Sequence, residues 1–112
     1  MRYALLALLA LTPMMTLGVY DLELADQIGQ RAKFYGLDPA RIVTLSLCES
    51  GLNPKAYSHD GGAEARGLWQ ITRKYHGEVS DKVAFDPIAS TEWTLKRLVL
   101  GFFSEWSCWN ML

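Results

Sequence analysis

The chain has 112 residues, of which 50% are hydrophobic and 21% charged, and a formal net charge of −1 at pH 7. This length and composition are typical of one compact domain, and the sequence contains no repeats or low-complexity linker. Its 11 Lys and Arg residues are offset by 12 Asp and Glu residues, so no basic patch points to a nucleic-acid partner.

Residues 1–18 differ in composition from the rest of the chain. Arg2 precedes an apolar run from Ala4 to Leu11, and a small residue suitable for cleavage follows. This order predicts a signal peptide, a folded domain over residues 19–112 and an exported protein, periplasmic or extracellular. An uncleaved signal anchor is the alternative, because the apolar stretch continues to Tyr20 and approaches the minimum of ~17 residues for a spanning helix.

The first predicted helix runs from Asp21 to Tyr35. Gly36 follows it and is a typical C-terminal cap. We interpret its apolar stripe as core, because the residues recur at helical spacing. They are Leu24, Ala25, Ile28, Ala32 and Tyr35.

The second predicted helix contains Glu49, a lone carboxylate in its last turn. Asp38 can cap this helix, Pro39 suits its first turn, and Gly51 ends it. The negative end of the helix dipole disfavours a carboxylate anion, and partial burial would raise the pKa of Glu49 further. Both effects suit a proton donor near neutral pH, and a solvated glutamate at a helix end is the alternative.

Turn-forming residues dominate the segment after this helix. Asn53-Pro54 and Asp60-Gly-Gly62 predict an irregular stretch or a small hairpin over residues 53–66. A further helix is predicted to start at Asp86-Pro87 and to end near Gly101, and we expect it to pack against the helix that carries the carboxylate. Its apolar residues are Ile88, Trp93, Leu95, Leu98 and Phe102.

The aromatic residues and histidines allow more than one interpretation. Trp69 could offer a sugar-binding face or pack in the core, and the sequence favours neither. Tyr57 and Tyr75 are weaker cleft candidates. His59 and His76 lack metal-ligand spacing with the cysteines, so we expect no metal and no cofactor. We assign the remaining tryptophans to packing; these are Trp93, Trp106 and Trp109.

The two cysteines, Cys48 and Cys108, predict a disulfide in an exported chain. Cleavage of 18 of the 112 residues leaves about 94, few for a stable core, so a covalent link would be useful. Two buried thiols are the alternative if the chain stays in the cytosol.

Three segments in order resemble the soluble lytic transglycosylase domain of the lysozyme-like superfamily. They are Glu49-Ser50, the turn Asn53-Pro-Lys-Ala-Tyr-Ser58, and Gly67-Leu-Trp-Gln-Ile71. Each is weak alone, but all three within about 25 residues are rarely accidental. The resemblance implies a mainly α (α+β) fold, with a cleft between the catalytic helix and the Gly67–Ile71 segment and a short hairpin region over it.

The resemblance also implies roles for individual residues. Glu49 matches the family's sole catalytic acid/base, Gln70 the glutamine that lines the sugar cleft, and Ser58 the serine that faces the substrate. Members of the family cleave the β-1,4 bond between MurNAc and GlcNAc in peptidoglycan and leave 1,6-anhydro-MurNAc ends. The substrate's N-acetyl group and C6 hydroxyl complete the displacement, so a second carboxylate is not required.

Two alternative functions stay open at the level of sequence. Hydrolytic muramidases use a second carboxylate, for which Asp60, Glu64, Asp81 and Asp86 are available, the first two in the predicted loop. A non-catalytic glycan-binding module would keep the cleft without turnover. Mutation of Glu49 to Gln distinguishes this module from an enzyme, because only an enzyme would lose turnover.

Two further comparisons with known families concern the cysteines and a missing tyrosine. The cysteine arrangement is similar to that of resuscitation-promoting factors, in which a Cys-Glu-Ser-Gly segment is tied to a C-terminal Cys. Longer transglycosylases continue with Ala-x-Tyr-Asn-x-Gly, whose tyrosine helps to orient the acid, and this chain has no such stretch. Either Tyr75 or an aromatic residue of the tail after Trp93 replaces that tyrosine, or the enzyme is weaker or differently selective.

The resemblance implies peptidoglycan glycan strands as the partner, and a membrane only if the N-terminal signal stays uncleaved. Small domains of this kind serve in wall remodelling, in secretion or conjugation machinery, and in bacteriophage entry or lysis. The sequence does not distinguish among these systems, and a monomer is the default expectation.

Overall fold

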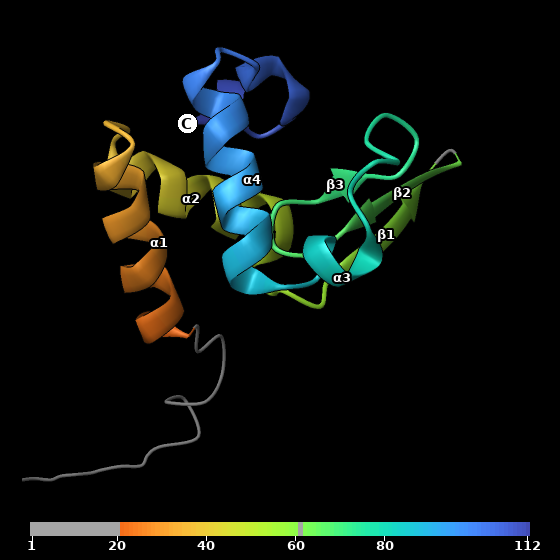
Figure 1. Cartoon of the computed structure of the whole chain (residues 1–112), viewed down its shortest axis with the longest axis horizontal. Helices are drawn as coiled ribbons and strands as arrows, with labels where there is room; N and C mark the ends of the chain where they lie inside the picture. The colour runs from red at the N-terminus through yellow and green to blue at the C-terminus, as the bar shows by residue number, and fades with distance from the viewer. Residues whose placement is uncertain (1–20, 61) are drawn as a thin grey trace, which may run out of the picture.

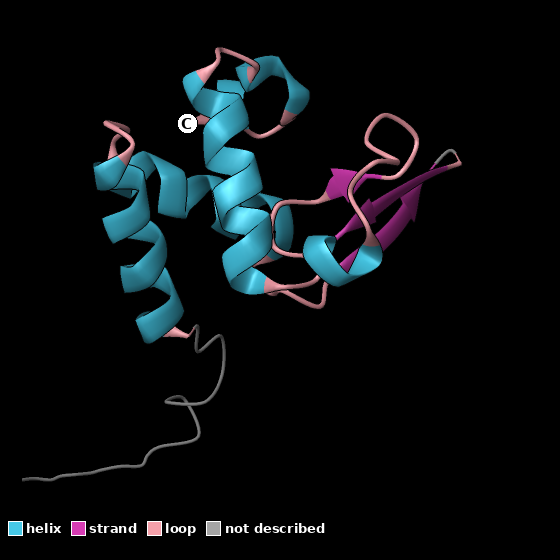
Figure 2. Ribbon diagram, in the orientation of Figure 1, coloured by secondary structure: helices cyan, strands magenta, loops and turns pink. Residues whose placement is uncertain are grey.

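The computed structural model describes residues 21–60 and 62–112, so the predicted signal segment, residues 1–18, lies outside the described residues. Three long helices gather on one side of the molecule and a small sheet on the other (Figures 1 and 2). The mainly helical α+β class predicted from the sequence is confirmed. The elements are α1 (Leu22–Phe34), α2 (Pro39–Ser50), β1 (Tyr57–Asp60), β2 (Ala63–Arg66), β3 (Ile71–Thr72), α3 (Asp81–Ala84), α4 (Pro87–Val99) and the 3-10 helices η2 (Phe103–Glu105) and η3 (Trp109–Met111).

The long helices begin and end at the residues that the sequence predicts. The side chains of Asp21, Asp38 and Asp86 each accept a hydrogen bond from a first-turn N–H, at 3.0, 3.2 and 2.6 Å. These bonds satisfy donors that the helix itself leaves free. After α1 and α2 the chain turns through left-handed glycines, Gly36 with φ 76° and Gly51 with φ 67°. Local sequence therefore sets the ends of these helices.

The apolar faces of the long helices meet in one core. Ile28 of α1, Leu45 of α2 and Leu95 of α4 are all almost completely buried. Two residues expected on the apolar face of the last helix are instead exposed, Ile88 to 54% and Phe102 to 44%. Ile88 lies in the first turn of α4, and Phe102 lies beyond the end of this helix.

Helix α4 shares the apolar core with α2, as the sequence predicts. Its backbone comes closest to α1 and α3, rather than to α2. The segment between β2 and β3 joins α2 to α4, because Ser50 Oγ donates to the carbonyl of Leu68 at 2.7 Å and Trp69 Nε1 donates to Thr91 Oγ1 at 2.9 Å. Buried side chains of this segment therefore take part in the packing between the helices. The sequence-based prediction did not include them.

The sheet is antiparallel with strand order β1-β2-β3, and its first two strands form the hairpin predicted over residues 53–66. Ser58 pairs with Ala65, and Ala65 in turn pairs with Thr72. Across residues 21–60 and 62–112, no helix combines the length and apolar character needed to cross a membrane.

Candidate active site

Glu49 lies in the last turn of α2 and is half-buried. The peptide N–H of Cys108 donates a hydrogen bond to its Oε2 at 3.1 Å. Burial raises the pKa of Glu49 above its ordinary value, and the hydrogen bond from Cys108 opposes that rise because it favours the anion. The net shift has the direction that a proton donor near neutral pH requires.

The disulfide between Cys48 and Cys108 fixes the C-terminal tail beside this carboxylate. The two Cα atoms are 6.1 Å apart, and 60 residues of sequence separate them. Cys108 is buried, whereas Cys48 is exposed. Because Cys48 directly precedes Glu49, the bond explains why the N–H of residue 108 reaches this acid. The predicted disulfide is confirmed.

Hydrogen bonds join the three sequence segments that carry the family resemblance. Ser50, which follows Glu49, donates to the carbonyl of Leu68 at 2.7 Å. The N–H of Gly67 then donates to the carbonyl of Ala56 at 2.7 Å. The second segment thus bonds to the third, and the third bonds to the helix that carries the acid.

Gln70 and Ser58 contact each other directly. The hydroxyl of Ser58 donates to Gln70 Oε1 at 2.6 Å, and Gln70 Nε2 donates to the carbonyl of Gly67 at 3.0 Å. The backbone of Gln70 is left-handed, with φ 51°, which is strained for a residue other than glycine. The hydrogen bonds of its side chain help to hold this strained conformation.

Of the aromatic candidates for sugar binding, Trp69 does not qualify, and its packing interpretation holds. Its side chain is fully buried and its indole N–H is bound to Thr91, so it has no face to offer a sugar and belongs to the core. Tyr57 and Tyr75 are exposed, to 54% and 69%. Tyr57 lies in β1 next to Ser58, whereas Tyr75 lies beyond β3 with the ammonium group of Lys74 over its ring.

Three of the four candidate second carboxylates are already engaged. Glu64 pairs with Arg73 at 2.9 Å, and that contact holds its pKa below the ordinary value. Asp81 accepts from Arg66 at 3.0 Å and Arg73 at 2.8 Å, which likewise lowers its pKa, and Asp86 caps α4. The side chain of Asp60 lies outside the described part of the chain.

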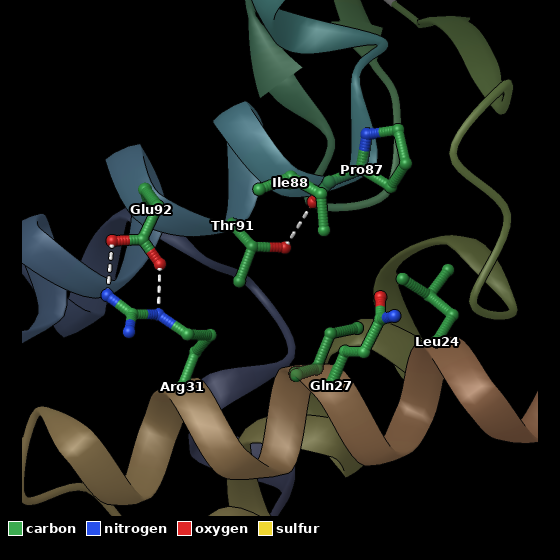
Figure 3. Close-up of a pocket in the computed structure, with 8 residues that line it drawn as sticks. Leu24, Gln27, Arg31, Pro87, Ile88, Thr91 and Glu92 are labelled. Atoms are coloured by element: carbon green, nitrogen blue, oxygen red, sulfur yellow. Dashed lines mark hydrogen bonds and ion pairs between the residues drawn. The ribbon is translucent and has the colours of Figure 1, made fainter.

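A hollow between α1 and α4 is separate from this site (Figure 3). Its volume of about 20 Å³ is enough for a water molecule but not for a sugar. The two charged groups at its rim pair with each other, since Arg31 donates to both carboxylate oxygens of Glu92 at 2.6 and 2.8 Å. We therefore treat the hollow as part of the packing between the helices.

Sequence reasoning missed Arg66, whose side chain is completely buried. Its guanidinium donates to the carbonyls of Ile71, His76 and Val79 at 3.2, 3.2 and 2.6 Å, and to the carboxylate of Asp81. It thereby holds the loop that follows β3. A lone arginine is usually exposed, so the sequence offers no signal for this role.

The match to known families covers most of the domain. Residues 26–100 match the model of the transglycosylase SLT domain, about two thirds of the chain. The chain belongs to this family. Comparison with curated proteins and with solved structures gave no match.

Membership of this family fits the small, mainly helical α+β architecture, which is consistent with a lysozyme-like fold, and it indicates a glycan-cleaving domain. The matched residues include Glu49, Ser58 and Gln70, whereas Cys108 lies beyond them.

Proposed function

We propose that the protein is a peptidoglycan lytic transglycosylase in which Glu49 is the sole general acid and base. The observation that supports this most directly is the half-buried carboxylate with a raised pKa at the end of α2. Glu49 lies on α2, to which hydrogen bonds join the other two family segments. The carboxylates of Glu64, Asp81 and Asp86 are engaged in other contacts.

Glu49 acts twice in the proposed reaction. The protonated carboxyl first gives its proton to the glycosidic oxygen, and the bond from that oxygen to C1 of MurNAc breaks while the N-acetyl group of the same sugar stabilises C1. The carboxylate then takes the proton from the C6 hydroxyl, whose oxygen forms a bond to C1. The acid is regenerated, no water is consumed, and the glycan ends in a 1,6-anhydro sugar.

Ser58 and Gln70 are the proposed contacts for the sugar. Their side chains form one hydrogen-bonded pair, and the hydroxyl of Ser58 is exposed at the edge of β1. Tyr57 is exposed and could offer its ring to a sugar, but it directly precedes Ser58 in β1, where successive side chains point to opposite faces, so it is a weaker candidate. Tyr75, which is also exposed, is a second candidate. Export, for which residues 1–18 are the proposed signal, would bring the site to its substrate.

The test is mass spectrometry of purified peptidoglycan after digestion by the disulfide-bonded chain, with Glu49→Gln in parallel. The proposal predicts soluble products with 1,6-anhydro ends from the wild-type chain and none from the variant, which still binds glycan. Reducing ends would instead identify a hydrolytic muramidase. Glycan binding without soluble products from either protein would identify a binding module.

A further inference from the structure

The family resemblance does not show which group orients the carboxylate of Glu49 in this chain. The expected tyrosine stretch is missing, and among residues 21–60 and 62–112 no tyrosine or tryptophan side chain donates a hydrogen bond to the carboxylate. The donor at Oε2 is the peptide N–H of Cys108, which lies beyond the residues that match the family model. The described residues thus show a main-chain donor from the C-terminal tail at this carboxylate.

We propose that the N–H of Cys108 is the positioning group of the acid, and that it reserves Oε1 of Glu49 for proton transfer. The proposal rests on the proposed function, because it concerns the same carboxylate.

The tail is held on both sides of this N–H. On one side, the indole N–H of Trp106 donates to the carbonyl of Trp69 at 2.9 Å. On the other side, the ring of Trp109 stacks on Phe103 at 4.7 Å, with the guanidinium of Arg41 3.9 Å from the ring centre. The disulfide to Cys48 fixes residue 108 itself. The direction of the N–H is therefore set by several independent contacts.

A peptide N–H can only donate, so the oxygen that it contacts must accept in both protonation states of the acid. In the protonated carboxyl the accepting oxygen is the carbonyl oxygen, which leaves the proton on Oε1. After proton transfer the same N–H stabilises the anion. The carboxylate thus keeps one orientation through both proposed proton transfers. The N–H also counteracts the rise in the pKa of Glu49 that burial causes.

The first test is an NMR titration of the full disulfide-bonded chain, and it needs no substrate. The amide proton of Cys108 should move downfield as Glu49 ionises, with the same midpoint as the side-chain carboxyl carbon of Glu49 and by more than any other amide of the tail. In Glu49→Gln the movement should disappear. A Cys108 amide that does not follow the ionisation of Glu49 would overturn the proposal.

The second test removes the N–H alone, by semisynthesis of a chain with an ester in place of the amide between Ser107 and Cys108. The matched control carries an ester one residue later, which removes the N–H of Trp109 and its 3.0 Å bond to the carbonyl of Trp106 in the same tail. Both chains keep every side chain, and mass spectrometry verifies their disulfides.

The ester at Cys108 should lower kcat on peptidoglycan roughly tenfold to a hundredfold with little change in KM, since a charge-assisted hydrogen bond is lost. The limb of the pH profile where Glu49 loses its proton should move to higher pH, because burial then acts unopposed. The control ester should show neither effect. Equal kinetics in the two esters would overturn the positioning role.

If the ester at Cys108 does not fold, the NMR titration decides the proposal by itself. A wild-type chain that releases no glycan fragments would overturn the proposed function, whereas the titration is independent of turnover, so the two failures are distinguishable.

Discussion

At the scale of single residues, Glu49 experiences two opposing effects. Burial raises its pKa, and the N–H of Cys108 lowers it. Because burial is the larger effect, the folded protein holds this proton to higher pH than the unfolded chain does. The stability that the protonated group contributes is therefore fully present below the unfolded-state pKa and is lost as pH rises through the folded-state pKa.

The Glu49→Gln variant should accordingly melt at a higher temperature than the wild-type chain at neutral pH. The difference should vanish below the ordinary carboxyl pKa, where Glu49 is protonated in both the folded and the unfolded chain, because a neutral amide and a neutral carboxyl then occupy the same place. Thermal unfolding of both proteins across the pH range checks this. The contributions of all other titrating groups to the pH dependence cancel when the two proteins are compared. A difference that is constant with pH would contradict the pKa shift.

Gly67 is a residue at which no side chain is tolerated. Its φ is +77°, and a Cβ atom there would lie 2.0 Å from the carbonyl oxygen of Ala84. We predict that Gly67→Ala lowers the free energy of unfolding by about 3 kcal/mol or more, through backbone strain and the clash with the main chain. Gly36→Ala is a matched control, with φ +76° and nothing within 4 Å of the added carbon.

The control should cost only the strain of the left-handed backbone, about 1–2 kcal/mol. Denaturant unfolding of the two variants measures both values. Equal losses would mean that the segment between β2 and β3 can move away from α3, against the packing described above.

At the scale of elements, the parts set by neighbouring residues could be predicted. The helices follow from Asp21, Asp38 and Asp86 at their starts, and the hairpin follows from the turn formers around Gly62. The burial of Trp69 could not be predicted, because it depends on a hydroxyl 22 residues further along the chain.

The loop between β3 and α3 should depend on Arg66. In Arg66→Met the carbonyls of Ile71, His76 and Val79 lose a buried donor, and we predict a loss of about 3 kcal/mol or more in the free energy of unfolding. Arg73→Met is the control, since among residues 21–60 and 62–112 the side chain of this exposed arginine forms ion pairs with Glu64 and Asp81 alone.

Exposed pairs of this kind contribute about 1 kcal/mol or less. Denaturant unfolding compares the two variants, and hydrogen exchange of the loop amides shows where each acts. If both variants lose the same stability, the buried guanidinium is not what holds the loop.

The disulfide is one of the contacts that hold the tail, and its contribution to stability can be measured separately. Removal of the disulfide by Cys48→Ala with Cys108→Ala should lower the free energy of unfolding by about 4 kcal/mol, the loop-closure value for a separation of 60 residues. Chemical denaturation of the oxidised wild-type chain and the double variant measures it. An unchanged stability would show that the contacts of Trp106 and Trp109 suffice to hold the tail.

At the scale of the whole molecule, the site joins parts that lie far apart in sequence. The position of Glu49 in the last turn of α2 could be predicted, because its helix, its motif and its cysteine are neighbours in the chain. The hydrogen-bond donor of Glu49 could not be predicted, because every residue except proline has a peptide N–H and the sequence does not show which one reaches the carboxylate. The same holds for Arg66, whose burial depends on how the chain after β3 folds back over β2.

The central claim is that one carboxylate carries the cleavage, and the most direct test is the rate of release of soluble glycan fragments by four proteins. These are the wild-type chain, Glu49→Gln, Glu64→Gln and Asp60→Asn. We predict that Glu49→Gln loses roughly a hundredfold to ten-thousandfold in rate, as expected for removal of a general acid and base, while the other two variants keep most of the activity. A comparable loss in Glu64→Gln or Asp60→Asn would contradict the account and indicate a paired-carboxylate hydrolase.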